Sequence, residues 1–281
     1  MRIVDAQVHI WGSGPPTNPN HRQVEVFSKD SLLAEMDEAH VDAAILHPPG
    51  WDPNGNDVAV DAARQHPDRF AILGHFPLDR PESRTLPAHW TDRPGMVGLR
   101  FALLQPHQRA WWTDGTMDWL WPAAEQAGLP VALLAAEFLP VVGQVAERHP
   151  RLKLLVDHLG RSGSAKDAPA FANVSELIAL ARYPNVAVKA TGAPSYSSEP
   201  YPYRNIHPYL RQLYDAFGPE RMFWGTDITR MPCSWQQCVT MFTEELPWLS
   251  ERDKELTMGE ALCTWLNWQP STTGASSPPT R

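Results

Sequence analysis

The strongest constraint on the fold is a repeated alternation between short apolar runs and longer segments of helical period. Eight runs are apolar at both odd and even positions, as in strands that are buried on both faces of a parallel sheet. They span Ile3–His9, Ala43–His47, Phe70–Phe76, Val97–Ala102, Val131–Ala135, Leu154–His158, Val186–Lys189 and Met222–Asp227. Eight strands in 281 residues give about 35 residues per unit, the size of one βα repeat in a (β/α)8 barrel.

The prolines support this division of the chain. Five of them stand between a helical segment and the next apolar run: Pro67, Pro130, Pro150, Pro184 and Pro219. Because proline cannot continue a helix, each one ends a helix and lets the chain turn back. An open, doubly wound sheet would show the same alternation, but no GxGxxG motif follows the first strand. The sequence therefore predicts an α/β protein with a single (β/α)8 TIM barrel.

The barrel is expected to occupy residues 1–268. Within it, Glu251–Trp268 places Leu256, Leu262 and Trp265 on or near one face, which predicts an additional C-terminal helix. Residues 269–281 are rich in Ser, Thr and Pro and have no apolar period. That composition is typical of a disordered C-terminal tail.

Charge and cysteine content exclude several classes of function. The net charge of −8 argues against binding to nucleic acid, which needs clustered Lys and Arg. Three cysteines without a CxxC motif indicate neither a disulfide framework nor a structural zinc site. The chain starts without a basic leader and has no run of about 18 apolar residues. We expect a cytoplasmic protein that acts on a small molecule and has no membrane partner.

Polar side chains end seven of the eight predicted strands. They are Gln7 and His9, His47, His75, Arg100, Asp157 and His158, Lys189, and Asp227. In a (β/α)8 barrel, the active site is built at this end of the strands. Each residue alone has a structural interpretation, but buried charges cost several kcal/mol unless they are paired or used. We interpret the group as one site, with Asp157 pointing away from His158 to cap the next turn.

Four motifs resemble the amidohydrolase-related ("amidohydrolase 2") branch of the amidohydrolase superfamily, in the order of that family and over nearly the whole chain. They are DAQVHIW (Asp5–Trp11), VDHLG (Val156–Gly160), VKATG (Val188–Gly192) and FWGTD (Phe223–Asp227). The resemblance implies a (β/α)8 barrel that hydrolyses small lactones, or that decarboxylates or hydrates aromatic and dienoic acids. Members usually bind a divalent metal, although some lactonases work without one.

The resemblance also implies roles for single residues. His9 and His158 match ligands of the metal or of the substrate carbonyl, and Asp227 matches a general base that can also bind the metal. Arg100 matches the position that holds a substrate carboxylate in the lactonase-like subgroup. The departure is Gln7, where the family usually has the first histidine of a His-x-His pair.

Gln7 leaves the metal question open. An amide oxygen is a weaker zinc ligand than imidazole, but His9, His158 and Asp227 still suffice for a catalytic zinc with an open position. Alternatively, the amide of Gln7 donates a hydrogen bond to a substrate oxygen in a site without metal. We therefore keep two expectations: a site that binds one divalent metal, zinc by preference, and a site without metal.

The leading hypothesis is hydrolysis of a small anionic lactone or a related cyclic ester or amide. Arg100, with Lys189 or Arg204, would bind the anionic group. The two histidines and Gln7, or a metal, would polarise the carbonyl while Asp227 activates water. The remaining substrate contacts are expected from His75, Tyr201 and Trp224.

Two other functions remain as alternatives. One is metal-dependent, non-oxidative decarboxylation of an aromatic or dienoic acid, with Asp227 as the proton donor to the ring. The other is a barrel that binds a small acid without turning it over. The tryptophans between Trp111 and Trp121 are expected either to pack between helices or to form a subunit contact, so a homodimer is one expectation for the assembly.

Overall fold

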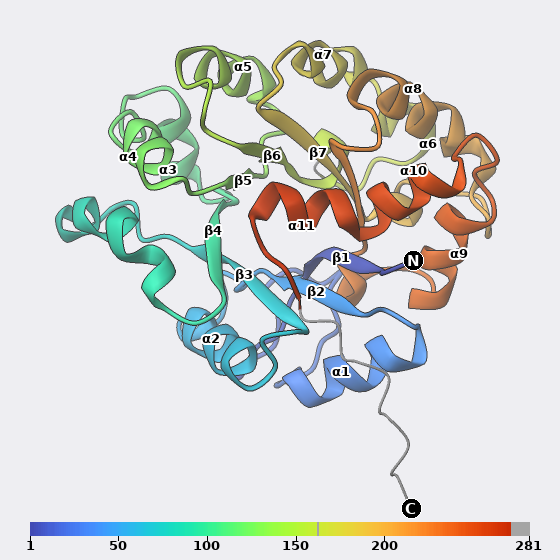
Figure 1. Ribbon diagram of the computed structural model, residues 1–281, viewed down its shortest axis with the longest axis horizontal. Coiled ribbons are helices and arrows are strands. Elements are labelled where there is room, and N and C mark those ends of the chain that lie inside the picture. Colours follow the sequence, from blue (N-terminus) through green and yellow to red (C-terminus); the bar gives the residue numbers. More distant parts are fainter. Residues whose placement is uncertain (162, 271–281) are drawn as a thin grey trace, which may run out of the picture.

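The computed structural model describes residues 1–161 and 163–270 (Figure 1). Its eight strands are parallel, and each is hydrogen-bonded to the next one along the chain. They are β1 (Val4–Val8), β2 (Ala43–Leu46), β3 (Phe70–His75), β4 (Met96–Phe101), β5 (Val131–Leu133), β6 (Leu154–Val156), β7 (Val186–Thr191) and β8 (Met222–Gly225). The predicted (β/α)8 barrel is confirmed.

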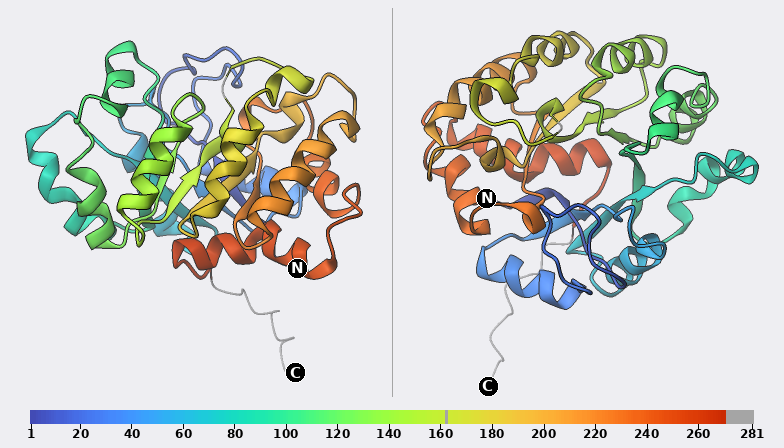
Figure 2. Two further views of the ribbon diagram at one scale, coloured as in Figure 1. Left: turned by 90° about the horizontal axis from the view of Figure 1, so that it is seen from above. Right: turned by 180° about the vertical axis from the view of Figure 1, so that it is seen from behind.

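Helices surround the strands as an outer layer, which is clearest in the two views of Figure 2. They are α1 (Lys29–Glu38), α2 (Gly55–Gln65), α3 (Pro106–Arg109), α4 (Leu120–Ala127), α5 (Leu139–Arg148), α6 (Asp167–Ala170), α7 (Val174–Ala179), α8 (His207–Phe217) and α9 (Trp235–Thr243). Side-chain caps start two of them, because Ser28 accepts a hydrogen bond from the N–H of Ser31, and Ser234 from that of Gln237. None of the helices in the described residues is long and apolar enough to cross a membrane.

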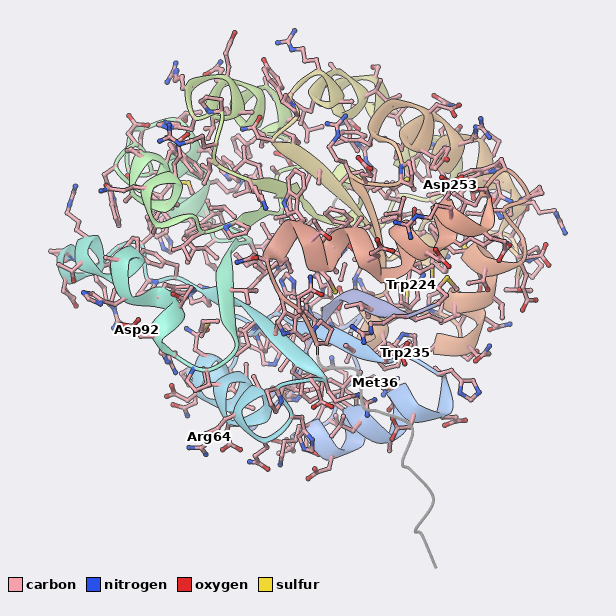
Figure 3. All side chains as sticks on the ribbon, viewed as in Figure 1. Met36, Arg64, Asp92, Trp224, Trp235 and Asp253 are labelled. Atoms are coloured by element: carbon pink, nitrogen blue, oxygen red, sulfur yellow. The ribbon has the colours of Figure 1, made fainter. Side chains whose placement is uncertain are left out.

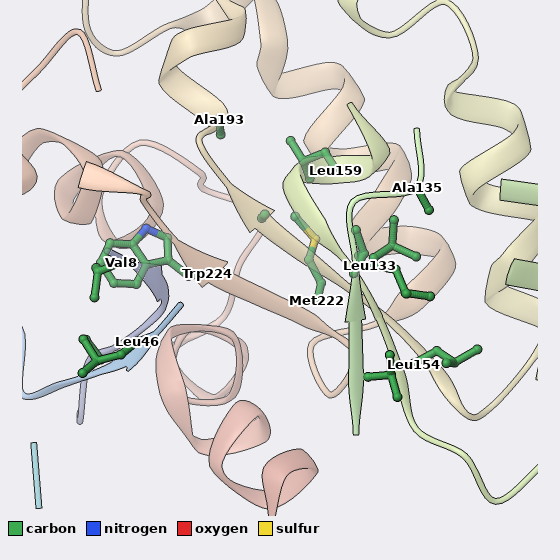
Figure 4. Packing of buried hydrophobic residues seen from close by; sticks show 14 of the residues in the cluster. Val8, Leu46, Leu133, Ala135, Leu154, Leu159, Ala193, Met222 and Trp224 are labelled. Atoms are coloured by element: carbon green, nitrogen blue, oxygen red, sulfur yellow. The ribbon is translucent and has the colours of Figure 1, made fainter. Parts of the chain in front are cut away.

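The strands bury one apolar layer on each of their two faces, because successive side chains alternate. The outer layer packs against the helices, and Figure 4 shows part of it around Val8, Leu46, Met222 and Trp224. The inner layer fills the barrel with smaller or branched side chains and one phenylalanine: Val4, Ala6, Ala43, Ile45, Ala71, Leu73, Ala132, Leu155, Ala187 and Phe223. In Figure 3, the charged side chains of Arg64 and Asp92 lie on the periphery.

The C-terminal segment closes the end of the barrel at which the strands begin (Figure 1). It consists of α10 (Glu251–Glu255), a π-helical turn η8 (Leu256–Glu260) and α11 (Ala261–Leu266). Residues of α11 pack against the inner layer, and the turn passes so close to β1 that a Cβ on Gly259 would lie 2.8 Å from Val4 Cγ2. The additional helix is present, with this turn as an interruption. The predicted disordered tail falls largely on 271–281, outside the described residues.

One carboxylate joins the last strand to the first. Asp5 Oδ1 accepts hydrogen bonds from the N–H groups of Gln7 and Thr226, both at 2.9 Å. Its Oδ2 accepts from Thr226 Oγ1 at 2.5 Å and from Trp235 Nε1 at 3.1 Å. The N–H of Asp227 then donates to the carbonyl of Gln7 at 2.8 Å. Asp5 therefore holds together the two chain segments that carry Gln7 and Asp227.

Replacing Asp5 by alanine should destabilise the barrel. The change leaves four buried donors without their acceptor, so we expect the free energy of unfolding to fall by at least about 3 kcal/mol. Urea unfolding followed by tryptophan fluorescence measures this. Glu147→Ala, an exposed carboxylate on α5, is the control and should change stability by less than about 0.5 kcal/mol. Equal stability of the two variants would contradict this role of Asp5.

Candidate active site

The polar side chains from the strand ends meet in one cluster at the end of the barrel opposite α11. The cluster contains the predicted residues Gln7, His9, His47, Arg100, Asp157, His158, Lys189 and Asp227, and in addition His21, Thr191 and Arg230. Nearly all are buried. The rule that strand ends carry the site therefore finds most of the cluster from sequence.

His9 and Asp227 form its central pair. His9 Nδ1 lies 2.6 Å from the carbonyl oxygen of His47, and because a carbonyl can only accept, Nδ1 carries the proton. His9 Nε2 lies 3.2 Å from Asp227 Oδ1, a buried atom with no hydrogen bond from any described residue. Neutral imidazole and carboxylate would place two lone pairs against each other. A proton or another cation is therefore needed between these two atoms.

Arg230 holds the other oxygen of Asp227. Its Nε donates to Asp227 Oδ2 at 2.5 Å. The glycine of the VKATG motif, Gly192, has a left-handed backbone with φ of 77°, which favours glycine, and a Cβ there would also lie 2.5 Å from Arg230 Nη2. Burial disfavours the charged form of Asp227, but His9 and Arg230 outweigh burial and hold the pKa of this carboxyl well below its usual range. Sequence reasoning missed Arg230 because it lies in the loop, three residues beyond the strand-end aspartate.

His21 comes from the loop between β1 and α1. Its Nδ1 lies 2.8 Å from Thr229 Oγ1, and the N–H of Arg22 donates to the carbonyl of Thr229 at 2.8 Å. These contacts place the His21 ring edge-on to His9, with 5.4 Å between ring centroids. Burial lowers the pKa of His21 to about 4. It was missed because no strand end or motif marks it; only its place between two barrel loops brings it into the cluster.

The donor chemistry around Asp227 fits a divalent metal. One ligand atom each from His9, His21 and Asp227 lies within 4.8 Å of the other two. Two imidazoles and one carboxylate are a ligand set that zinc accepts while keeping an open position. The predicted third ligand was His158, whose Nε2 lies 3.8 Å from Asp227 Oδ2. The structure also brings His21 to His9 and Asp227, as a second candidate for the third ligand.

Lys189 does not reach a substrate. Its side chain is completely buried, and Nζ lies 2.7 Å from Asp157 Oδ1, 2.8 Å from Gln7 Oε1 and 3.2 Å from His47 Nε2. Burial lowers its pKa to about 8, against the opposing effect of Asp157. The predicted role of Lys189 in substrate binding is therefore corrected: it faces the barrel interior and is covered by its partners.

Asp157 does not cap a turn either. It lies between Lys189 and Arg100, whose Nε donates to Asp157 Oδ2 at 3.0 Å. The alternation that predicted an outward side chain ends with β6 at Val156, and His158 already has a left-handed backbone with φ of 54°. The turn therefore brings both Asp157 and His158 into the cluster.

Arg100 remains able to bind an anion. Only its Nε is used by Asp157, its side chain is 12% exposed, and neither Nη donates to another residue in the described part of the chain. A guanidinium held in this way offers two parallel donors to a carboxylate. His75 lies beside it, since the two residues are partners in the β3–β4 register, and its side chain is exposed.

Three predicted substrate contacts are not brought to the cluster. Tyr201 donates its hydroxyl to Thr240 Oγ1 of α9 at 2.9 Å. Arg204 forms a surface ion pair with Glu245, at 2.9 Å, and its side chain is 67% exposed. Trp224 lies on the outer face of β8 and packs against the helices (Figure 4), because its strand neighbour occupies the inner face. The loop after β7 therefore contacts α9 through Tyr201 and the segment just after α9 through Arg204, with two of the side chains expected in the pocket.

A comparison with protein-family models matches residues 4–271 to a model described as amidohydrolase. The chain belongs to the amidohydrolase family. This amidohydrolase is 30% identical over 247 residues to 4-sulfomuconolactone hydrolase of Hydrogenophaga intermedia, an alignment that covers 81% of this chain and 77% of that protein. It is also 31% identical over 96 residues to L-fucono-1,5-lactonase of Burkholderia ambifaria, which covers 34% of this chain and 33% of the lactonase.

Solved structures agree on the fold. A crystal structure of an amidohydrolase from Burkholderia multivorans with bound zinc superposes with a TM-score of 0.78. The match covers 96% of this chain and 100% of the other, at 19% identity. Identity at this level supports the barrel alone. Together with the lactone hydrolases among its relatives, the family assignment establishes this amidohydrolase as a hydrolase.

The buried histidines should make the fold sensitive to acid. Burial lowers the pKa values of His21, His47 and His158, so below about pH 6.5 the unfolded chain takes up protons that the folded chain does not. Their contribution to stability is present above that pH and is lost on acidification. His21 alone should cost about 2 kcal/mol between pH 7 and pH 5.

Urea unfolding of the wild type and of His21→Asn at these two pH values measures the effect. The variant should lose about 2 kcal/mol less than the wild type on acidification. His40→Asn is the matched control, because His40 is exposed and has a left-handed backbone that asparagine tolerates. A His21→Asn variant with the pH dependence of the wild type would contradict the burial effect.

Proposed function

We propose that this amidohydrolase opens a small lactone that carries an anionic group. The observation that carries the proposal is the buried pair of His9 and Asp227 at the same strand ends as Arg100, whose Nη groups are unused by the described residues. Hydrolysis of such a lactone needs a general base to activate water and a guanidinium or similar group to bind the anionic substituent. The names of the two lactone-hydrolysing relatives support this choice, and one of those names includes an anionic sulfo group.

In the proposed mechanism, Asp227 accepts a proton from the attacking water. Arg230 occupies Oδ2, so Oδ1, which has no hydrogen bond from the described residues, is the atom that offers a lone pair to this proton. A cation held at Oδ1 would use the second lone pair of the same oxygen. The low pKa keeps the carboxylate ionised at neutral pH, and thus ready to accept. The water oxygen then bonds to the lactone carbonyl carbon, and the proton passes from Asp227 to the ring oxygen as the ester bond breaks.

The carbonyl oxygen gains negative charge as water adds to it, and the cluster provides positive charge close by. The nearest donors belong to His9, when its Nε2 is protonated, and to Arg230. A divalent cation, zinc by preference, would polarise the carbonyl as a Lewis acid. His9 and Asp227 would hold it, with either His158, as the family resemblance implies, or His21, as the geometry offers, as third ligand.

Asp227→Asn should abolish most of the activity. An amide cannot accept the proton of the water, so we expect kcat to fall by about 10²–10⁴-fold, with KM within about threefold of the wild type. Ring opening of a panel of anionic lactones, followed by proton release, measures both constants. Glu245→Gln, which removes a carboxylate from the surface pair with Arg204, is the control and should keep the wild-type rate.

Three outcomes would overturn the proposal. Full activity of Asp227→Asn would remove the general base. Release of CO2 from aromatic or dienoic acids without lactone turnover would identify the protein as a decarboxylase. Stabilisation by small acids without any turnover would identify a binding protein.

Arg100→Gln should affect binding of the anion more than the chemistry. Losing a charged, two-pronged contact costs about 1.5–3 kcal/mol, so KM for an anionic lactone should rise about 10–150-fold. An uncharged lactone of the same ring size is the internal control, and its kcat/KM should change by less than about threefold. Arg100→Lys keeps the charge but not the fork and should give an intermediate KM. Equal losses on both lactones would contradict anion recognition by Arg100.

A further inference from the structure

We propose that a divalent cation binds between His9 Nε2, His21 Nε2 and Asp227 Oδ1, and that His21, not His158, completes the ligand set. The inference deepens the proposed function, because it assigns the cation of the same site to particular atoms. It concerns cation binding, however, and can be tested without any turnover.

The first argument is the spacing of the three residues. One ligand atom each of His9, His21 and Asp227 lies within 4.8 Å of the other two, and His9 Nε2 and Asp227 Oδ1 are 3.2 Å apart. Two ligands that share one tetrahedral zinc, with bonds of about 2.0–2.1 Å, lie about 3.3 Å apart. Asp227 Oδ1 is buried and has no hydrogen bond from the described residues. A cation at this point would neutralise the facing lone pairs of His9 and Asp227.

The second argument is that the ligand side chains are already oriented. His9 Nδ1 donates to the carbonyl of His47, which leaves its Nε2 as the ligand atom. His21 Nδ1 contacts Thr229 Oγ1, which likewise directs Nε2 away from Thr229. Arg230 occupies Asp227 Oδ2 and leaves Oδ1. Hydrogen bonds of this kind, made by the side-chain atom of each ligand that does not bind the metal, are the usual way in which proteins orient metal ligands.

The third argument removes His158 from the set. Lys189, held by Asp157, donates to Gln7 Oε1 at 2.8 Å. This contact fixes the amide, because the opposite orientation would place its NH2 group against the ammonium. Gln7 Nε2 therefore faces His158 Nε2 at 3.0 Å, and Arg230 Nη2, which can only donate, lies 3.1 Å from His158 Nδ1. Both ring nitrogens of His158 thus already face N–H groups of the protein, so the nitrogen that would bind a metal is occupied.

Gln7 thus has two effects on the site. It takes the place of the first ligand of the usual His-x-His pair, and its amide nitrogen occupies the position beside His158 Nε2. His21 compensates from a different segment, since the N–H of Arg22 and the ring of His21 both bind Thr229, two residues after Asp227. The cation site is thereby moved toward the loop that follows β1.

Zinc binding by chelator-stripped protein tests the proposal. Competition with a chromophoric chelator should give one Zn²⁺ per wild-type chain. The affinity for Zn²⁺ should fall at least about 100-fold in His21→Asn and stay within about threefold of the wild type in His158→Asn. Thr229→Val, which removes only the contact behind His21, should weaken binding about 10-fold. Co²⁺ added in place of Zn²⁺ should give the absorption bands of a low-coordinate site in the wild type and in His158→Asn, and lose them in His21→Asn.

Thermal unfolding of each stripped variant shows whether it is folded before metal is added, and His40→Asn serves as the surface-histidine control. Zinc affinity of His21→Asn equal to that of the wild type would overturn the proposal. So would a loss of affinity in His158→Asn as large as in His21→Asn, or an absence of binding in the folded wild type.

Failure of this inference can be told apart from failure of the proposed function. If stripped wild type hydrolyses anionic lactones while the zinc tests fail, the ligand set is wrong and the proposed hydrolysis stands. If zinc binds through His21 and no lactone is opened, the ligand set stands and the proposed function is wrong.

Discussion

The ion pair between Lys189 and Asp157 inside the barrel is the interaction on which the rest of the site depends. Both side chains are completely buried, so neither charge is stable there without the other and without further hydrogen bonds. Lys189 donates such bonds to Gln7 and His47, and Asp157 accepts one from Arg100. One buried pair therefore fixes the amide orientation on β1 and the guanidinium on β4.

Barrel closure and the proposed chemistry use the same chain segments. Asp5 connects Thr226, at the end of β8, to β1. Gln7 stands two residues after Asp5, and Asp227 directly follows Thr226. Asp227 itself has a left-handed backbone, with φ of 59°, a conformation that costs a non-glycine residue energy and that the surrounding contacts must maintain. The hydrogen bonds of Asp5 thus also support the carboxylate of Asp227, so a change that weakens them would displace the proposed general base as well.

The departure from the family motif has structural partners. Glutamine at position 7 is satisfied on both sides, by Lys189 at its oxygen and by His158 at its nitrogen. Gln7, Lys189 and His158 therefore form one connected group of buried side chains, and His21 lies beside His9 and Asp227 as a possible ligand.

Much of the architecture could be predicted from local sequence. Buried parallel strands are apolar on both faces and prolines end helices, so the eight βα units could be located from the sequence. The expectation that active-site residues follow the strands then identified Gln7, His9, Arg100 and Asp227. The apolar pattern and the strand ends are both local properties of short segments. The rule failed where the chain leaves the regular strand: Asp157 turns inward after β6 ends, and Trp224 faces the helices.

Only the tertiary structure decided which loop side chains complete the site. His21 and Arg230 reach Asp227 through contacts between loops, and Tyr201 and Arg204 are held by α9 and Glu245. No local pattern encodes such contacts, because a loop has no fixed period and its path depends on what it packs against. The sequence by itself determined the barrel and the ring of strand-end residues. The packing of loops that are distant in sequence determined which of those residues face one another.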